Sequence, residues 1–248
     1  MSLKNTIIGI FIVFVVALML AEGEPKPMAH WSYGEDEGPK EWASLDERYA
    51  MCEQGLNQSP INITGAIEAK LSPLVLEGTS KATTFVNNGH SVEAAFAGGN
   101  TLTIDNKKYN LKQVHFHTPS ENTIDGKSFP MEAHLVHASG SSLAVVAVMF
   151  EVGADNSVLN KLLRNLPENK DDSNKLKSTI TGYEILPANK DYYRFSGSLT
   201  TPPCTEGVKW FVLKTPVSIS KSQLKDFMEV MPKNNRPVQD INSRLILN

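Results

Sequence analysis

The chain has 248 residues, 21% of them charged and 41% hydrophobic, and a formal net charge of −3. These values are ordinary for a globular protein, and they exclude the strongly basic surface that binds nucleic acids, so we expect no nucleic-acid partner. The length after the N-terminal segment suits one large β domain or two small ones.

The first 21 residues have the composition of a secretory signal peptide. Lys4 precedes an uncharged apolar run over residues 7–21, which ends at the small residue Ala21. One positive charge before about 15 apolar residues is typical of an export signal, whereas a full membrane span needs about 20. A retained anchor is the alternative. The sequence predicts a signal peptide over residues 1–21, a mature domain over residues 22–248, and a periplasmic or secreted protein.

The remaining chain has mainly β-type patterns. Residues 22–40 are rich in glycine, proline and acidic residues, and they predict an irregular surface arm. Short β-type runs bounded by turn residues follow at 83–86, 101–104, 110–117 and 143–152. Only residues 157–166 and 220–231 predict helices. We therefore expect a single, mainly β domain built on a large, twisted, mostly antiparallel sheet with a few short peripheral helices.

Three histidines on two of these β runs have matching parity. Alternation along a strand places His115 and His117 on one face of the first run. In the next run the same alternation places Glu132, His134 and Val136 on one face, while His137 points the other way. If the two runs pair, three imidazoles converge. Three neutral imidazoles with one open position are typical of a catalytic zinc site, which lowers the pKa of bound water to about 7.

Two polar residues on the same face strengthen the metal interpretation. Gln113 and Glu132 each lie two residues before a candidate ligand. Imidazoles that bind a metal usually donate their outer N–H group to an oriented acceptor. An isolated His-x-His pair on a strand is more often incidental than functional. The third histidine and the two acceptors favour the metal site.

The two cysteines, Cys52 and Cys204, lie far apart in the sequence. In a reducing cytosol both would be free thiols. In an exported chain, an even number of cysteines favours a disulfide.

At several places the sequence resembles the α-class carbonic anhydrases, and the resemblance covers nearly all of the exported chain. The matching blocks are residues 31–34 (WSYG), 58–62 (QSPIN), 87–90 (NNGH), 113–121 (QVHFHTPSE), 132–137 (EAHLVH), 196–203 (SGSLTTPP) and 235–239 (NRPVQ). Each block is weak alone, but their occurrence together in this order is specific. The resemblance implies a zinc enzyme that reversibly hydrates carbon dioxide to bicarbonate and a proton, and that sulfonamides and anions inhibit. A homodimer is an open alternative for its oligomeric state.

The resemblance also implies roles for individual residues. It implies that His115, His117 and His134 are the Zn²⁺ ligands. Gln113 and Glu132 are implied to orient two of them. Thr200 is implied to accept a hydrogen bond from zinc hydroxide and to donate its own proton to Glu121, because an ionised carboxylate only accepts. His90 is implied as the proton shuttle. The residues that match the apolar carbon dioxide pocket are Val136, Val145, Leu199, Val208 and Trp210. The residues that match the water-ordering group are Tyr33, Asn88 and Thr201.

Some residues depart from the pattern of other members of the family. The block after His117 continues Thr-Pro-Ser-Glu, a form associated with bacterial members in which a pair such as Cys52 and Cys204 forms a disulfide. Glu93 stands where some members have a neutral polar residue. Its charge is expected to raise the pKa of His90 or to alter the water network.

Two alternatives compete with this interpretation. His115, His117 and Glu121 also match the first metal motif of cupin-type enzymes, which would make Glu121 a ligand. Tyr109 occupies the position where that motif has glycine, which argues against a cupin. The second alternative is a catalytically silent binding module with the carbonic anhydrase fold. Such modules typically lack one or more of the zinc histidines, all of which are present here.

Overall fold

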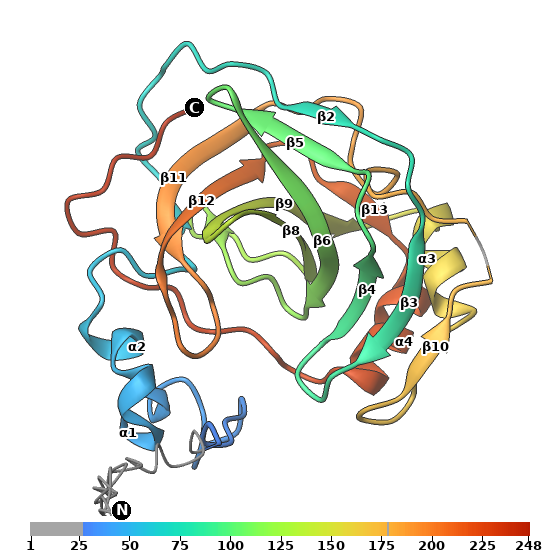
Figure 1. The fold of residues 1–248 in the computed structure, drawn as a ribbon, viewed down its shortest axis with the longest axis horizontal. Coiled ribbons are helices and arrows are strands. Elements are labelled where there is room, and N and C mark those ends of the chain that lie inside the picture. Colours follow the sequence, from blue (N-terminus) through green and yellow to red (C-terminus); the bar gives the residue numbers. More distant parts are fainter. Residues whose placement is uncertain (1–26, 178) are drawn as a thin grey trace, which may run out of the picture.

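The computed structural model describes residues 27–177 and 179–248, so the predicted signal peptide lies outside the described residues. Most of the described strands form one 11-stranded sheet, and β1 and β7 form a separate pair (Figure 1). The strands are β1 (Asn62–Ile63), β2 (Val75–Glu77), β3 (Ala82–Asn87), β4 (Val92–Phe96), β5 (Thr101–Ile104), β6 (Lys107–His117), β7 (Thr123–Ile124), β8 (Met131–Ser139), β9 (Ser142–Val152), β10 (Ser173–Lys175), β11 (Tyr192–Ser198), β12 (Glu206–Leu213) and β13 (Val217–Ile219).

The large sheet runs in the order β10-β3-β4-β6-β8-β9-β12-β11, with β5 and β2 continuing from β6 and with β13 beside β9. Most neighbouring strands are antiparallel, and β12 and β13 both run parallel to β9. The expectation of a single, mainly β domain with a mostly antiparallel sheet is confirmed. The apolar run predicted at 143–152 is the central strand β9, in which residues 144–150 are all buried.

Both predicted helices are present, with shorter bounds. Helix α3 (Ser157–Leu163) begins after an N-cap at Asn156, and α4 (Lys221–Val230) begins with a capping box between Ser220 and Gln223. The sequence did not predict the one-turn helices α1 (Trp42–Leu45) and α2 (Met51–Gln54) or the 3₁₀ helix η1 (Glu47–Tyr49), because elements this short carry no periodic pattern. In Figure 1, α3 and α4 lie beside one end of the sheet, and α1 and α2 lie at the opposite side. Among the described helices, none has the length and apolar character needed to cross a membrane.

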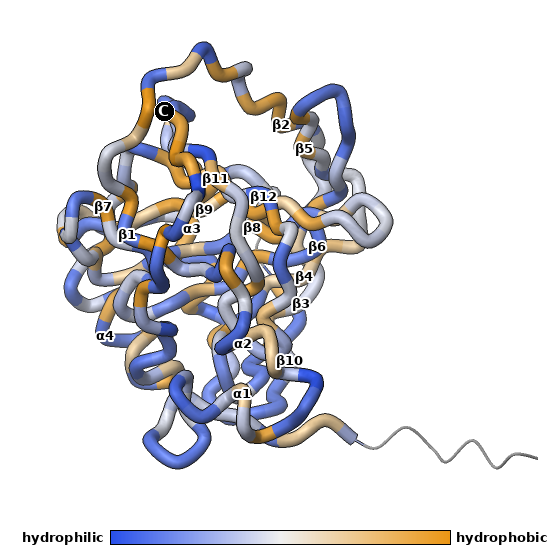
Figure 2. The backbone as a smooth tube through the Cα atoms, turned by 90° about the vertical axis from the view of Figure 1, so that its left-hand side faces the viewer, coloured by the Kyte–Doolittle hydropathy of each residue, from blue (hydrophilic) through white to orange (hydrophobic). Residues whose placement is uncertain are grey.

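The core lies on both faces of the sheet. Along β9, Val146 and Val148 belong to one apolar cluster, whereas Val145 and Met149 belong to a second. This alternation explains why the whole run is apolar, since each face of the strand is covered by packed side chains. In Figure 2, hydrophobic residues concentrate around β8, β9 and β12 in the middle of the molecule, and the outer loops are more hydrophilic.

The described part of the N-terminal arm is irregular, as predicted, but it packs closely against the domain. Trp31 and Tyr33 are partly buried and contact Trp42, with ring centroids 5.3 and 5.8 Å away. This aromatic group lies against the disulfide between Cys52 and Cys204. The arm is therefore held in place beside the sheet.

Candidate metal centre

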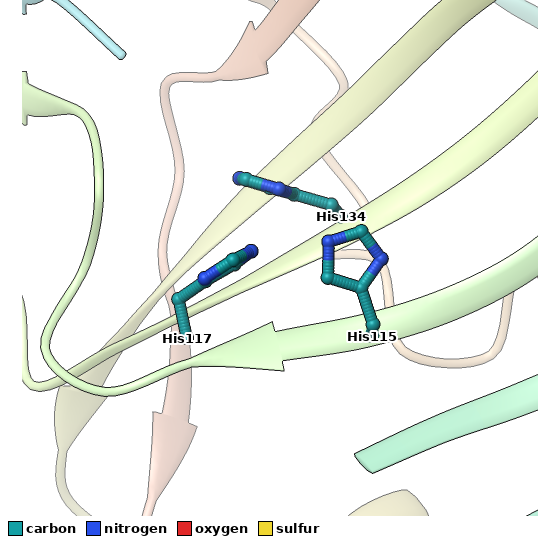
Figure 3. Close-up of side chains that lie close together, drawn as sticks. All are labelled: His115, His117 and His134. Atoms are coloured by element: carbon teal, nitrogen blue, oxygen red, sulfur yellow. The ribbon is translucent and has the colours of Figure 1, made fainter. Parts of the chain in front are cut away.

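The pairing of β6 with β8 brings the three predicted ligands together. His115 and His134 are directly opposite each other in the ladder, and His117 is two residues further along β6 on the same face. The ring centroids are 4.6 to 5.1 Å apart. One nitrogen from each ring lies within 4.8 Å of the others, and Figure 3 shows the rings turned toward one another. The convergence expected from strand parity is confirmed.

The two predicted acceptors each face the outer nitrogen of one ring. Gln113 Oε1 lies 2.8 Å from His115 Nδ1, and Glu132 Oε1 lies 3.0 Å from His134 Nε2. If these outer nitrogens carry the hydrogens, the lone pairs of His115 Nε2 and His134 Nδ1 face the centre of the cluster. Glu132 is itself fixed, because the side-chain amide of Asn122 donates to it at 2.8 Å.

The acceptor for His117 was not predicted from the sequence. Its Nδ1 lies 2.8 Å from the backbone carbonyl oxygen of Asn234. The Asn234 side chain donates to the carbonyls of His90 and Phe116, each at 2.9 Å, and so ties the loop to both segments. A carbonyl acceptor contributed by a distant loop leaves no pattern in the sequence around the histidine.

The donor set fits zinc. Burial lowers the pKa of His117, and it lowers the pKa of His115 and His134 well below the ordinary value, so all three are neutral at pH 7. His117 Nε2 is buried and has no hydrogen-bond partner among the described residues. Three neutral imidazoles with inward lone pairs are the ligands of catalytic zinc sites.

Thr200 and Glu121 are hydrogen-bonded beside the cluster. The Thr200 hydroxyl donates to the Glu121 carboxylate, and the Arg236 backbone N–H donates to Glu121 Oε1 at 2.9 Å. Glu121 Oε2 lies 3.4 Å from His117 Nε2. Burial raises the pKa of Glu121 to about 8 in the protein alone. A divalent cation at the histidines acts in the opposite direction and favours the ionised, accepting form.

The buried guanidinium of Arg236 is a second feature that the sequence did not predict. It donates to Gln58 Oε1 and to the Ser59 carbonyl at 2.8 Å, and to the Cys52 carbonyl at 2.6 Å. Its side chain is 1% exposed. Burial lowers the pKa of Arg236 to about 10, so the side chain stays charged at neutral pH. Arg236 thereby connects two parts of the site. Its backbone N–H binds Glu121, and its guanidinium binds the helix that carries Cys52 of the disulfide.

The predicted disulfide is present and lies next to the loop that carries Thr200. Cys52 of α2 is bonded to Cys204, across 152 residues of sequence. The Cys204 backbone N–H donates to the Thr201 carbonyl at 2.8 Å, and its own carbonyl accepts from the Gln58 side chain at 3.0 Å. The bond therefore fixes the end of the 199–204 loop.

The five predicted pocket residues belong to one apolar cluster on the histidine side of the sheet. The ring centroid of Trp210 lies 4.9 Å from that of His134. The three buried residues are Val145, Val208 and Trp210, and the two partly buried ones are Val136 and Leu199. The cluster forms an apolar wall directly beside the metal centre.

His90 lies in the turn between β3 and β4. Asn88 Oδ1 accepts from the backbone N–H groups of His90 and Ser91 at 2.9 and 2.8 Å, so Asn88 shapes this turn. The His90 ring stacks on Trp31 with centroids 3.8 Å apart. Tyr33 packs in the same aromatic group, and burial followed by the charge of Glu121 raises its pKa.

Of the two effects expected of Glu93, the raised pKa of His90 is wrong, and the altered water network stays a prediction. The pKa of His90 is lowered, first by burial and then by His30 and Lys170. Glu93 is directly opposite His115 in the β4–β6 ladder, so its side chain lies over the metal-binding face and not beside the turn.

His137 lies on the opposite face from the three ligands, as strand parity predicted. Its Nδ1 is 2.8 Å from the Leu135 carbonyl, and its ring stacks on Tyr183. Burial lowers the pKa of His137 to about 4. It is a neutral core residue that takes no part in the cluster.

Comparisons with known proteins agree with this arrangement. The model of the eukaryotic-type carbonic anhydrase family matches residues 37–248. A carbonic anhydrase of Klebsiella pneumoniae is 47% identical, over 88% of this chain and 91% of its own length. A solved α-carbonic anhydrase of Thermovibrio ammonificans, in complex with sulfanilamide, is 45% identical with a TM-score of 0.87 and covers 89% of this chain and 99% of its own. The Photobacterium profundum α-carbonic anhydrase is 47% identical with a TM-score of 0.85, covering 88% and 100%. With its histidine cluster, its fold and these relatives in agreement, the chain belongs to the α-class, eukaryotic-type family of carbonic anhydrases and is an enzyme of that family.

Proposed function

We propose that this enzyme catalyses the zinc-dependent, reversible hydration of carbon dioxide to bicarbonate and a proton, with His90 as the proton shuttle. The observation that carries the proposal is the convergence of three neutral histidines beside a hydrogen-bonded Thr200–Glu121 pair and an apolar wall. Membership in the family excludes the cupin-type alternative. Family membership does not exclude the catalytically silent binding module, which a measurement of activity tests.

The three histidines would hold the zinc ion through His115 Nε2, His117 Nε2 and His134 Nδ1. When bound, zinc supplies Lewis-acid activation of water, which makes a nucleophile available near neutral pH. The protein's own contribution is orientation. The acceptors on the outer nitrogens fix the tautomer and the angle of each ring, so the inward lone pairs are in place before the ion binds.

Thr200 selects what binds beside the histidines. Because its hydroxyl hydrogen is engaged by Glu121, its oxygen is left as an acceptor and favours a group that carries a hydrogen of its own. The backbone N–H of Arg236 holds the Glu121 carboxylate from the other side. The pair therefore orients a hydrogen-bearing nucleophile and favours it over ligands that can only accept.

The apolar wall suits carbon dioxide. This substrate has no hydrogen to donate, so a pocket of Val145, Val208 and Trp210 holds it without leaving a buried polar group unpaired. Trp210 contacts His134 edge-on, which places the wall within reach of the reacting centre.

The proposal is tested by metal analysis together with stopped-flow carbon dioxide hydration. We expect about one zinc per chain, activity that is lost with a chelator and restored by zinc, and inhibition by anions and by an unsubstituted aromatic sulfonamide. The Thermovibrio ammonificans relative is a sulfanilamide complex, and a deprotonated sulfonamide nitrogen still carries a hydrogen for Thr200. A zinc-loaded protein that neither hydrates carbon dioxide nor binds sulfanilamide would instead be the silent module.

Replacing His90 by alanine is expected to lower kcat in weak buffer and to leave kcat/KM for carbon dioxide nearly unchanged. Burial, His30 and Lys170 lower the pKa of His90, so at neutral pH its ring is a free proton acceptor that also releases a proton readily. Added imidazole should restore part of the rate, measured by stopped flow. A parallel fall of kcat and kcat/KM without rescue would instead indicate a structural role.

We also propose that the chain is exported, on the apolar N-terminal segment and on the Cys52–Cys204 bond, which persists in oxidising compartments. Fractionation of the source cells and N-terminal sequencing test this. Recovery of the uncleaved chain from the cytoplasm would contradict it.

A further inference from the structure

His30 and Glu37 form an ion-pair geometry at the rim of the site, beside the proposed shuttle. We propose that this pair is a second proton station, which takes the proton from His90 and passes it to buffer in the solvent. The inference rests on the shuttle role proposed above for His90. It gives the N-terminal arm a catalytic task in addition to its packing role.

The arm places both residues by local contacts. The Ser32 backbone N–H donates to the Glu37 carbonyl at 2.9 Å, closing a turn that brings Glu37 back toward His30. Glu37 Oε2 then lies 3.0 Å from His30 Nδ1. If Nδ1 carries the hydrogen, the Nε2 lone pair of His30 is free to accept a proton.

His30 is close enough to His90 for a proton to cross. The ring centroids are 6.2 Å apart, so the facing ring edges are within the span of one bridging water molecule. Stacking on Trp31, the residue after His30, holds the His90 ring at this distance. The rings of His30 and His90 line a surface cleft of about 360 Å³. The His30 side chain is 60% exposed, so it can exchange protons with the solvent.

The surroundings of the His90 ring favour release of its proton. The pKa of His90 is lowered first by burial and then by His30 and by Lys170, which lines the same cleft. Glu37 Oε2 lies 3.0 Å from His30 Nδ1, within hydrogen-bond distance of that ring. The proton therefore passes from a partly buried ring to an exposed ring that lies against a carboxylate.

The transfer is balanced without any other reactant. The imidazolium of His90 gives one proton to His30 Nε2 and returns to its neutral form. His30 becomes an imidazolium paired with the Glu37 carboxylate, and it then releases one proton to a buffer base. No covalent bond other than N–H bonds forms or breaks.

The test compares stopped-flow carbon dioxide hydration by zinc-loaded variants at low and high buffer concentration. His30→Ala should lower kcat roughly threefold in weak buffer, where proton release to solvent limits turnover, and leave kcat/KM unchanged. Concentrated buffer should remove the difference, since the buffer then reaches His90 directly. Glu37→Gln should give a smaller fall of the same kind. Glu35→Gln is the matched control, because this exposed acid lies on the same turn, and it should have no effect.

The same comparison in the His90→Ala background separates the two proposals. There His30→Ala should cause no further loss, because the proton no longer arrives from His90. An additional loss of similar size would show a route independent of His90 and overturn the relay. Unchanged kcat in His30→Ala, with His90→Ala still impaired, would overturn the relay alone. Unchanged kcat in His90→Ala would overturn the shuttle and the relay together.

Discussion

His134→Ala is expected to lose nearly all bound zinc and to lower carbon dioxide hydration by several orders of magnitude. Two imidazoles remain in the variant, too few for the three-ligand catalytic site, and the buried carboxylate of Glu132 loses its partner at 3.0 Å. His115→Ala and His117→Ala should behave in the same way. Zinc content by elemental analysis and the rate by stopped flow measure the effect.

His137→Gln is the matched control for this loss. His137 is on the same strand as His134 and equally buried, but it lies on the opposite face. It should therefore keep stoichiometric zinc and near-normal activity. Stoichiometric zinc in His134→Ala, with a circular dichroism spectrum like that of the parent, would overturn the ligand assignment. Loss of zinc in His137→Gln with a retained fold would do the same.

Removing the disulfide is expected to destabilise the protein by up to about 5 kcal/mol, the chain-entropy value for a loop of 152 residues. The double variant Cys52→Ala/Cys204→Ala should unfold at a lower urea concentration than the oxidised parent. Activity should fall as well, because Cys204 fixes the end of the loop that positions Thr200.

A reducing agent supplies the control, since the chain has only these two cysteines. It should lower the unfolding midpoint of the parent to that of the double variant and leave the double variant unchanged. Thiol titration would report two free thiols in the reduced parent. If the reduced parent, with two free thiols, unfolded at the same urea concentration as the oxidised parent, the bond would contribute nothing to stability.

The sequence by itself determined which side chains of each run share a face, and the pairing of β6 with β8 then brought the two faces together. Strand parity is a local property with a period of two residues, so His115 and His117 share a face wherever the strand lies. The same rule excluded His137. The apolar run of β9 likewise predicted a strand covered on both faces, because no polar position interrupts residues 144–150. The long blocks shared with α-carbonic anhydrases supplied the family.

Only the tertiary structure decided the contacts that come from distant loops. Asn234 lies 117 residues from His117, and Arg236 lies 184 residues from the Cys52 carbonyl it binds. Glu93 illustrates the same limit: it is three residues from His90 in the chain, yet the β4–β6 ladder places it opposite His115, and the pKa of His90 shifts the other way. His30 belongs to the predicted surface arm and its side chain is 60% exposed, yet its ring lies 6.2 Å from that of His90. Strand periodicity constrains side-chain direction only within an element, whereas the pairing of separate segments depends on the whole packed chain.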